Sequence, residues 1–237
     1  MKAIGIVGFK NSGKTTLARA LAQELLQRGH RVAAVKHSSE GLDLLGKDTA
    51  RLREFADQVG FVSPQESGIF LRGARSLEEI LSHLRADFVV IEGFKEERTF
   101  PKIVCLSGQP EDEELFDGLA ICAVGLAPQG RELDVPLLNP DEIREIADLV
   151  EEKAFKLPSL DCGGCGFETC YGLAREIVKG ARSVEDCVSL RPSVEVRING
   201  QPMPLNPFVS EIVVSAIKGL LAPLKGFSEG EIEIRIG

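Results

Sequence analysis

The chain has 237 residues, enough for one large domain or two smaller ones, and its hydrophobic content of 43% can build an ordinary core. Its formal net charge of −8, with neither a basic patch nor a basic tail, argues against a nucleic-acid or membrane-surface binder. No signal-peptide core follows the first methionine and no apolar run could span a bilayer. We therefore expect a cytoplasmic protein without a membrane segment.

The first 28 residues predict a strand, a loop and a helix. Residues 3–7 are a short apolar run typical of a strand, and a helical pattern runs from Thr16 to about Arg28, with Gly29 as its stop. Between them, residues 8–15 read Gly-Phe-Lys-Asn-Ser-Gly-Lys-Thr. This is a complete G-x-x-x-x-G-K-[ST] phosphate-binding loop in the context that the motif requires. The structural alternative is a glycine-rich turn that only caps the helix.

The residue types of this loop suit phosphate chemistry. The glycines let the backbone wrap close to a phosphate, and the amide N–H groups at the helix start point at it. Lys14 adds positive charge toward the outer phosphates, and the Thr15 hydroxyl can ligate Mg²⁺. We expect the nucleotide to contact Gly8, Asn11, Ser12, Gly13, Lys14, Thr15 and Thr16.

Strand and helix patterns then alternate up to about residue 155. Strands are predicted at 31–36, 88–91, 103–106 and 121–124, with two short strand-like runs near Phe61 and Ile69, and helices at 49–58, 77–84 and 141–153. Fully apolar strands separated by helices are typical of a mostly parallel sheet covered on both faces. We predict an α/β fold of the P-loop NTPase type. Because ligands bind at the carboxyl ends of such strands, the loop at 8–15, the segment after Lys36 and the turn at Glu92 should meet at one edge.

Three carboxylates are candidates for the metal side of this edge. Glu92 ends a strand, where an acidic residue can support Mg²⁺ opposite a phosphate-binding loop; the alternative is a carboxylate at the rim without a ligand. Asp43 and Asp48 could hold Mg²⁺ or its waters, or position a hydrolytic water. Asp48 could equally cap the helix that follows.

Four cationic or titratable side chains are candidates for contacts with an anionic ligand. Lys36 and His37 follow a strand and could contact nucleotide phosphates or a pterin phosphate. Lys95 and Lys102 could supply further positive charge. Solvated surface side chains are the alternative in each case.

Three stretches beyond the loop carry a family resemblance. They are Val35-Lys36-His37 followed by Asp43 and Gly46-Lys47-Asp48-Thr49, then Val90-Ile91-Glu92-Gly93-Phe94-Lys95, and then Pro101-Lys102-Ile103. Their order and spacing resemble the MobB family, the P-loop proteins of molybdopterin-guanine dinucleotide biosynthesis, over roughly residues 1–155. The resemblance implies GTP·Mg²⁺ binding, at most slow GTP hydrolysis, and a homodimer. It also implies a molybdopterin guanylyltransferase of the MobA type, or other molybdoenzyme maturation factors, as partner. No Asn-Lys-x-Asp motif is present, so GTP rather than ATP rests on the resemblance.

The six cysteines fall into two classes. Cys105 and Cys122 lie singly in apolar runs, where we expect buried structural thiols. The other four have the spacing C-x2-C-x4-C-x16-C and are Cys162, Cys165, Cys170 and Cys187. Clustered cysteines in a cytosolic chain indicate a metal site more than disulfides. Four thiolates suit zinc or an iron–sulfur cluster, although structural zinc usually shows two separated C-x-x-C pairs.

The cysteine segment has a resemblance of its own. The stretch Cys-Gly-Gly-Cys-Gly-Phe-Glu-Thr-Cys, followed by Ala174, Gly180 and Cys187, resembles the [4Fe–4S] domain found in the B component of the Rnf electron-transport complex and in the corrinoid iron–sulfur protein. The resemblance implies a [4Fe–4S] cluster held by the four cysteines, with zinc or four unligated thiols as alternatives. A helix is predicted at 169–179. The segment is too short for its own apolar core, so we expect a metal to hold its shape.

The tail predicts a small ββαβ unit. Residues 194–198 alternate in polarity, Asn199-Gly200 is a strong hairpin turn, and a second strand runs through Met203. Residues 206–221 have helical spacing, and residues 232–236 alternate again. With a boundary at Pro158, we divide the chain into a nucleotide-binding domain at 1–157, an iron–sulfur module at 158–190 and an α+β domain at 191–237.

Three functional hypotheses follow. The first is a GTP-binding accessory protein of molybdenum or tungsten cofactor maturation that carries an added iron–sulfur cluster. The second is a nucleotide-gated electron-transfer or metallocluster-insertion protein, in which the phosphate-binding loop only switches conformation. The third is a non-enzymatic adaptor for a guanylyltransferase.

Overall fold

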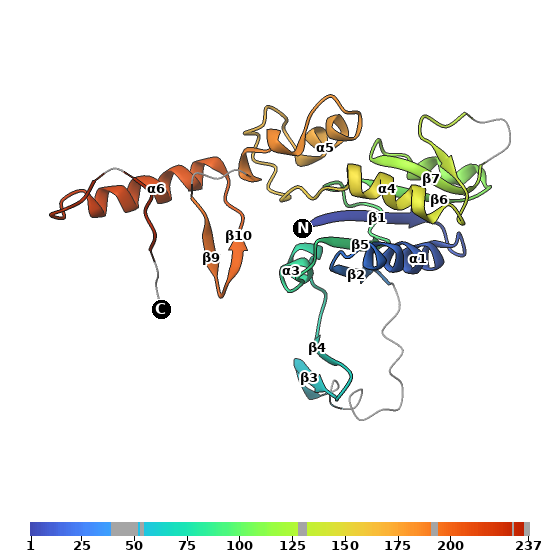
Figure 1. Ribbon diagram of the computed structural model, residues 1–237, viewed down its shortest axis with the longest axis horizontal. Helices are drawn as coiled ribbons and strands as arrows, with labels where there is room; N and C mark the ends of the chain where they lie inside the picture. Colours follow the sequence, from blue (N-terminus) through green and yellow to red (C-terminus); the bar gives the residue numbers. More distant parts are fainter. Residues whose placement is uncertain (39–51, 53–54, 128–131, 191–193, 229, 235–237) are drawn as a thin grey trace.

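The computed structural model describes residues 1–38, 52, 55–127, 132–190, 194–228 and 230–234 (Figure 1). Six strands form one parallel sheet in the order β2-β5-β1-β6-β7-β8. They are β1 (Lys2–Gly8), β2 (Val32–Lys36), β5 (Phe88–Glu92), β6 (Lys102–Ser107), β7 (Ala120–Leu126) and β8 (Leu137–Leu138). The predicted α/β fold with a mostly parallel sheet is confirmed. The strand β8 was not predicted, because two residues are too few to produce a pattern.

Helices cover both faces of this sheet because successive side chains of each strand point to opposite sides. On one face, Ile4 and Ile6 pack with residues of α1 (Lys14–Gln27) and α4 (Ile143–Lys153). On the other face, Ala3 packs with residues of α3 (Leu77–Ser82). Fully apolar strands are therefore buried on both sides, as the sequence pattern indicated.

The strand register brings the predicted ligand-binding segments to one edge. In the neighbouring strands β2 and β5, Lys36 lies opposite Glu92. In β1, which leads into the phosphate-binding loop, Ile6 lies opposite the same Glu92. The carboxyl ends of β1, β2 and β5 therefore meet, as we expected.

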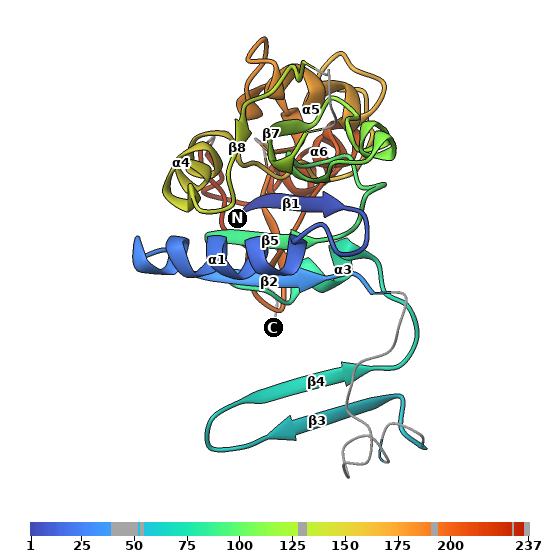
Figure 2. The ribbon, with the colours of Figure 1, turned by 90° about the vertical axis from the view of Figure 1, so that its right-hand side faces the viewer.

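A separate hairpin projects from the sheet (Figure 2). Its strands β3 (Gln58–Val62) and β4 (Ser67–Leu71) pair antiparallel with each other and join no other strand among the described residues. The two strand-like runs are thus confirmed. Residues 49–51 and 53–54 of the helix predicted from Thr49 to about Gln58 lie outside the described residues, and Gln58 belongs to β3. Gln58 is a good helix former by itself, and its pairing with Leu71, distant in sequence, places it in a strand instead.

The cysteine segment shares a hydrophobic core with the nucleotide-binding domain. Its helix α5 (Cys170–Val178) is capped by the preceding Thr169, whose side chain accepts a hydrogen bond from the Gly172 N–H. One buried cluster joins Leu119, Phe155 and Leu157 of the first domain to Cys170, Leu173, Ala174 and Cys187. Leu119, Phe155 and Leu157 therefore complete a core to which the cysteine segment contributes the remaining side chains.

The tail forms a hairpin and a helix that stand away from the parallel sheet (Figure 1). The strands β9 (Val196–Ile198) and β10 (Gln201–Met203) are joined by Asn199 and Gly200, both with positive φ, as the turn prediction requires. The helix α6 (Pro207–Leu221) follows. The predicted last strand is not formed over 231–234, and 235–236 lie outside the described residues. Alternation alone cannot form a strand where no neighbouring strand offers hydrogen bonds.

None of the helices in the described ranges combines the length and the apolar character needed to cross a membrane. The most apolar of them is α6, which has 15 residues. A bilayer requires about 20 apolar residues in a helix.

Candidate functional site

The phosphate-binding loop has the tight backbone that its sequence predicts. Asn11 and Gly13 both adopt the left-handed conformation, with φ of 67° and 83°. At the end of β1, a Cβ atom on Gly8 would lie 2.3 Å from the Ser12 Oγ and 2.7 Å from the Cys105 carbonyl oxygen. Only glycine fits there, because the Cys105 oxygen belongs to the backbone and cannot move aside.

Two polar groups of the loop lack a full set of partners. The Ser12 hydroxyl is buried and makes no hydrogen bond within the described part of the chain. The Lys14 ammonium donates to the Phe9 carbonyl oxygen at 2.5 Å, so this lysine is folded back on its own loop. Buried polar groups are normally paired, and a phosphate group would offer oxygen acceptors to both side chains.

Residues predicted to bind Mg²⁺ lie together beside the phosphate-binding loop. The Thr15 hydroxyl donates to Glu92 Oε1 at 2.8 Å. The Lys36 ammonium lies 3.7 Å from the same carboxylate oxygen. The Glu92 side chain is 13% exposed, so a cation beside it balances a largely buried charge.

His37 is held against the turn that follows Glu92. Its backbone N–H donates to the Glu92 carbonyl oxygen at 2.9 Å, and its ring centroid lies 4.7 Å from that of Phe94. Gly93 has a φ of 90°, and a Cβ atom there would lie 3.0 Å from the His37 Cβ. The predicted edge residues therefore form one compact corner. Asp43 and Asp48 lie outside the described residues.

Lys95 and Lys102 have different environments. The Lys95 ammonium lies 3.8 Å from the centroid of the Phe9 ring, within the phosphate-binding loop. Burial, and then the charge of Lys14, lower the pKa of Lys95. Lys102 is 1% exposed and donates to Asp117 Oδ2 and to the Lys95 carbonyl oxygen, each at 2.6 Å. Both sequence-based interpretations of Lys102 were wrong, because this ammonium is neither solvated nor free to bind a ligand.

Asp117 is an important residue that the sequence analysis missed. Its Oδ1 accepts the Leu119 N–H at 3.1 Å, while its carbonyl oxygen accepts the Tyr171 hydroxyl at 2.5 Å. The Tyr171 ring in turn lies 4.8 Å from the Arg98 guanidinium. Asp117 thus joins the interior of the sheet to the helix that begins at Cys170. No local motif marks it, since its partners are far away in the sequence.

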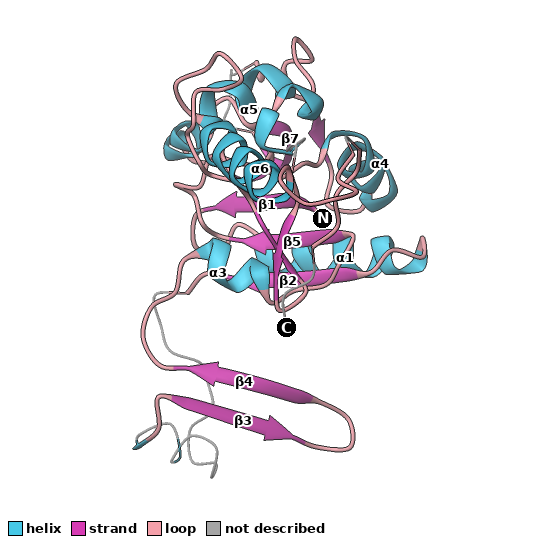
Figure 3. Ribbon diagram, turned by 90° about the vertical axis from the view of Figure 1, so that its left-hand side faces the viewer, coloured by secondary structure: helices cyan, strands magenta, loops and turns pink. Residues whose placement is uncertain are grey.

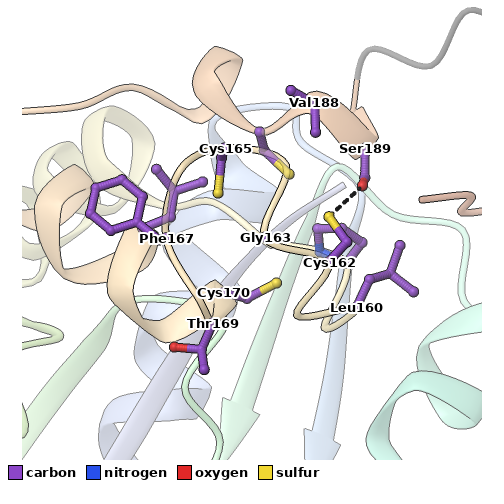
Figure 4. Close-up of a pocket in the computed structure, with 12 residues that line it drawn as sticks. Leu160, Cys162, Gly163, Cys165, Phe167, Thr169, Cys170, Val188 and Ser189 are labelled. Atoms are coloured by element: carbon purple, nitrogen blue, oxygen red, sulfur yellow. Dashed lines mark hydrogen bonds between the residues drawn. The ribbon is translucent and has the colours of Figure 1, made fainter. Parts of the chain in front are cut away.

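The four clustered cysteines line one small cavity (Figure 4). Cys162, Cys165, Cys170 and Cys187 are all free thiols. The cavity has a volume of about 10 Å³ and is otherwise lined mainly by apolar side chains. Burial raises the pKa of the Cys170 and Cys187 thiols. The sequence-predicted ligand set is therefore gathered at one place.

The thiols surround this cavity without converging on a single point. Within the described ranges, no three His, Cys, Asp or Glu side chains come close enough to hold one metal ion. A cavity of this size admits about one water molecule, so a larger group requires the loop to open. Gly163 and Gly166 give that loop positive φ values, and a Cβ at either would meet no atom within 4 Å. Gly164 of the same loop is packed closely, since a Cβ atom there would lie 2.7 Å from the Val188 Cγ2. The donor chemistry fits a thiolate-bound metal group, and the free space lies at Gly163 and Gly166.

The two remaining cysteines are structural, as predicted. Cys105 and Cys122 are buried in the sheet, and burial raises the pKa of each thiol to about 12. Neither is a thiolate at neutral pH, so neither is a ready metal ligand.

Two family models match the chain. The model described as "Molybdopterin guanine dinucleotide synthesis protein B" (MobB) matches residues 3–125. The model described as "Putative Fe-S cluster" matches residues 157–189, which include all four clustered cysteines.

Relatives with similar sequences carry related names. A protein of Methanocaldococcus jannaschii, named "Putative molybdopterin-guanine dinucleotide biosynthesis adapter protein", is 32% identical over 235 residues. That comparison covers 95% of this chain and 93% of the relative. A Haemophilus influenzae protein, named "Molybdopterin-guanine dinucleotide biosynthesis adapter protein", is 33% identical over 62% of this chain and 86% of its own length.

Solved structures of similar proteins share the fold. A MobB protein homologue from Bacillus stearothermophilus has a TM-score of 0.50 at 26% identity, covering 64% of this chain and 97% of its own. Bacillus subtilis MobB has a TM-score of 0.54 at 24% identity over the same shares. The second likeness supports the fold alone.

Proposed function

Because this chain belongs to the MobB family, we propose that it is a GTP-binding accessory protein of molybdopterin-guanine dinucleotide biosynthesis, acting in molybdenum or tungsten cofactor maturation. The observation that carries the proposal is the corner at which Thr15, Glu92 and the phosphate-binding loop meet. The named relatives are called adapter proteins. The family resemblance extends the proposal to a guanylyltransferase of the MobA type as partner, slow hydrolysis of GTP, and a homodimer.

The loop and its edge define the proposed ligand contacts. Backbone amides of the loop and the Lys14 ammonium would hold the phosphates, while the Thr15 hydroxyl and the Glu92 carboxylate would hold Mg²⁺, which balances phosphate charge. Lys36 and His37 would border the outer phosphates or the pterin phosphate. Asp43 and Asp48 stay in the proposal as further candidates for the metal or its waters.

Replacing Glu92 with glutamine should weaken the Mg²⁺-dependent part of GTP affinity by roughly tenfold. The amide oxygen of glutamine can still accept the Thr15 hydroxyl, so the change removes the charge and keeps the shape. Calorimetric titration with GTP, in Mg²⁺ and again in EDTA, measures the two affinities.

Glu96, an exposed carboxylate in the following turn, gives the matched control as Glu96→Gln. Its affinities should equal those of the unchanged chain. An equal loss for Glu92→Gln with and without Mg²⁺ would count against the metal role. The same titration with ATP decides which base is preferred.

For the cysteine pocket we propose a [4Fe–4S] cluster held by Cys162, Cys165, Cys170 and Cys187. A zinc ion needs its four ligands around one atom, whereas each thiolate of a cubane cluster binds a different iron, so cluster ligands stand farther apart. The four thiols line one cavity, which supplies the donor set that a cluster needs at one place once the loop opens. The finer likeness to the Rnf and corrinoid protein domains remains part of the proposal.

Anaerobically purified protein should contain iron and acid-labile sulfide in equal amounts, with the broad visible absorption of a cluster. Cys170→Ser should lose most of both, because Cys170 starts α5 and lines the pocket. Cys122→Ala, which changes a buried thiol in the sheet, should keep them. Zinc without sulfide in the purified chain would contradict the proposal.

One observation favours a second candidate, a nucleotide-gated electron-transfer or metallocluster-insertion protein. Contacts run from the Phe9 ring through Lys95 and Lys102 to Asp117, which binds Tyr171 beside Cys170. A cluster potential that changes when nucleotide binds would support this function. An unchanged potential would leave the cluster as a structural support, and GTP turnover near zero beside an active guanylyltransferase would indicate a non-enzymatic adaptor.

A further inference from the structure

The helix α6 presents an unpartnered apolar face. Phe208 is 70% exposed, Ile212 is 51% exposed and Leu220 is 76% exposed. None of its residues belongs to a hydrophobic cluster in the part of the chain that the structure describes. Figure 1 shows α6 beside the β9–β10 hairpin and away from the parallel sheet; Figure 3 looks along this separation, so that α6 lies in front of the sheet. A run of exposed large apolar side chains on one helix face marks an interaction surface.

The outer face of α6 has a distinct order of side-chain sizes. Phe208, Ile212, Ser215 and Gly219 follow one another at helical spacing and are all exposed. The two large side chains lie in the first half of the row, and the two small ones in the second half. Ser210, by contrast, is buried on the opposite side of the helix.

This order is complementary to itself in an antiparallel arrangement. If a second copy of α6 runs in the opposite direction, Phe208 lies over Gly219 of that copy and Ile212 lies over its Ser215. In two antiparallel copies of a helix, the numbers of facing residues have a constant sum. Both pairs therefore belong to one register, because 208 plus 219 equals 212 plus 215. A large side chain then meets a small one at each position, which allows two helices to pack closely.

The charges of α6 suit the antiparallel direction. Glu211 and Lys218 are exposed on one edge of the row, and neither makes an ion pair within the described residues. In the register given above, Lys218 of the second copy is offset by two residues, about 3 Å along the axis, from the position opposite Glu211. Two long side chains can span this offset, and twofold symmetry repeats the pair.

We propose that α6 is a self-association surface, through which two copies of this chain pair antiparallel. The surface is built from residues outside 3–125 and 157–189, the ranges that the two family models match. Pro207, the first residue of α6, approaches the cysteine loop, where a Cβ atom on Gly164 would lie 3.0 Å from its Cγ. The association tests are therefore run on one preparation of stated iron and nucleotide content.

Charge reversal in the full chain tests the pairing. Glu211→Lys and Lys218→Glu should each weaken one association step by roughly tenfold at low salt, because each places like charges opposite each other. The double variant should restore that step. An equimolar mixture of the two single variants should also restore it, since the lysine introduced in one copy then faces the glutamate introduced in the other. Sedimentation velocity over a concentration series measures the association.

Gly219→Gln tests the register by size. A Cβ at Gly219 would meet no atom within 4 Å, and glutamine favours helix more than glycine, so the single chain should be at least as stable. Association through α6 should nevertheless weaken by about tenfold or more, because the new side chain fills the space for Phe208. Val62→Glu, on the exposed β3–β4 hairpin, is the matched control and should leave this step unchanged.

A chain that stays monomeric at every concentration overturns the proposal. So does an assembly that none of the α6 variants weakens, because it would use another surface such as the β3–β4 hairpin. Weakening that the mixture of charge variants fails to repair overturns the antiparallel arrangement.

Discussion

Replacing Asp117 with alanine should lower the free energy of unfolding by about 3–5 kcal/mol, because it leaves a buried lysine without its counter-charge. Lys102 is 1% exposed, and Asp117 supplies the carboxylate that its ammonium contacts at 2.6 Å. The Lys95 carbonyl oxygen remains as a partner, but a neutral acceptor does not balance the charge. Urea unfolding followed by circular dichroism measures the loss.

Asp87 provides the matched control for this prediction. Its carboxylate contacts the Arg31 guanidinium at the same distance of 2.6 Å, but both side chains are largely solvated. Asp87→Ala should therefore cost much less stability than Asp117→Ala, since water replaces the lost partner. The pair of variants separates the effect of burial from the effect of distance. Equal losses would contradict our account of Lys102.

A double variant tests the same point from the other side. Lys102→Met together with Asp117→Asn removes both charges and keeps similar side-chain volumes. It should be clearly more stable than Asp117→Ala, because no uncompensated charge then remains in the core. If the double variant unfolds as easily, the loss comes from the shape of the Asp117 turn rather than from the Lys102 charge.

Replacing Lys14 with alanine should weaken the binding of GTP·Mg²⁺ by about 100-fold or more. The ammonium donates to the Phe9 carbonyl oxygen at 2.5 Å in the bare loop, and a phosphate oxygen is a stronger acceptor. The stability of the chain should change little, since this ammonium is not part of a buried cluster. Calorimetric titration measures the affinity, and urea unfolding measures the stability.

Lys10 lies in the same loop and serves as the control. It is exposed, so Lys10→Ala should remove an equal charge while leaving most of the affinity in place. Unchanged binding of GTP·Mg²⁺ by Lys14→Ala would mean that the nucleotide site has been assigned wrongly. Equal losses for the two variants would indicate a general charge effect rather than a specific phosphate contact.

Features that depend on neighbouring residues could be predicted from the sequence. The loop at 8–15 could be recognised because its glycines and Lys14 act within one turn of backbone. Fully apolar runs separated by helical patterns predicted the sheet, and the turn at Asn199-Gly200 formed as its residue types require. Parallel strand order then placed Thr15 beside Glu92, since strands of one sheet direct their carboxyl ends to one edge.

The burial partners of each segment come from the three-dimensional packing. The sequence left Lys102 either as a ligand contact or as a solvated cation, and the structure pairs it in the interior with Asp117, fifteen residues away. The apolar partners of the cysteine segment, Leu119, Phe155 and Leu157, likewise come from other parts of the chain. Conversely, α6 has an apolar pattern that predicts burial, yet no segment among the described residues covers its outer face. A helix or strand pattern depends on residues a few positions apart in the sequence. The burial of a side chain depends on which distant segment packs against it, and a local pattern does not identify that segment.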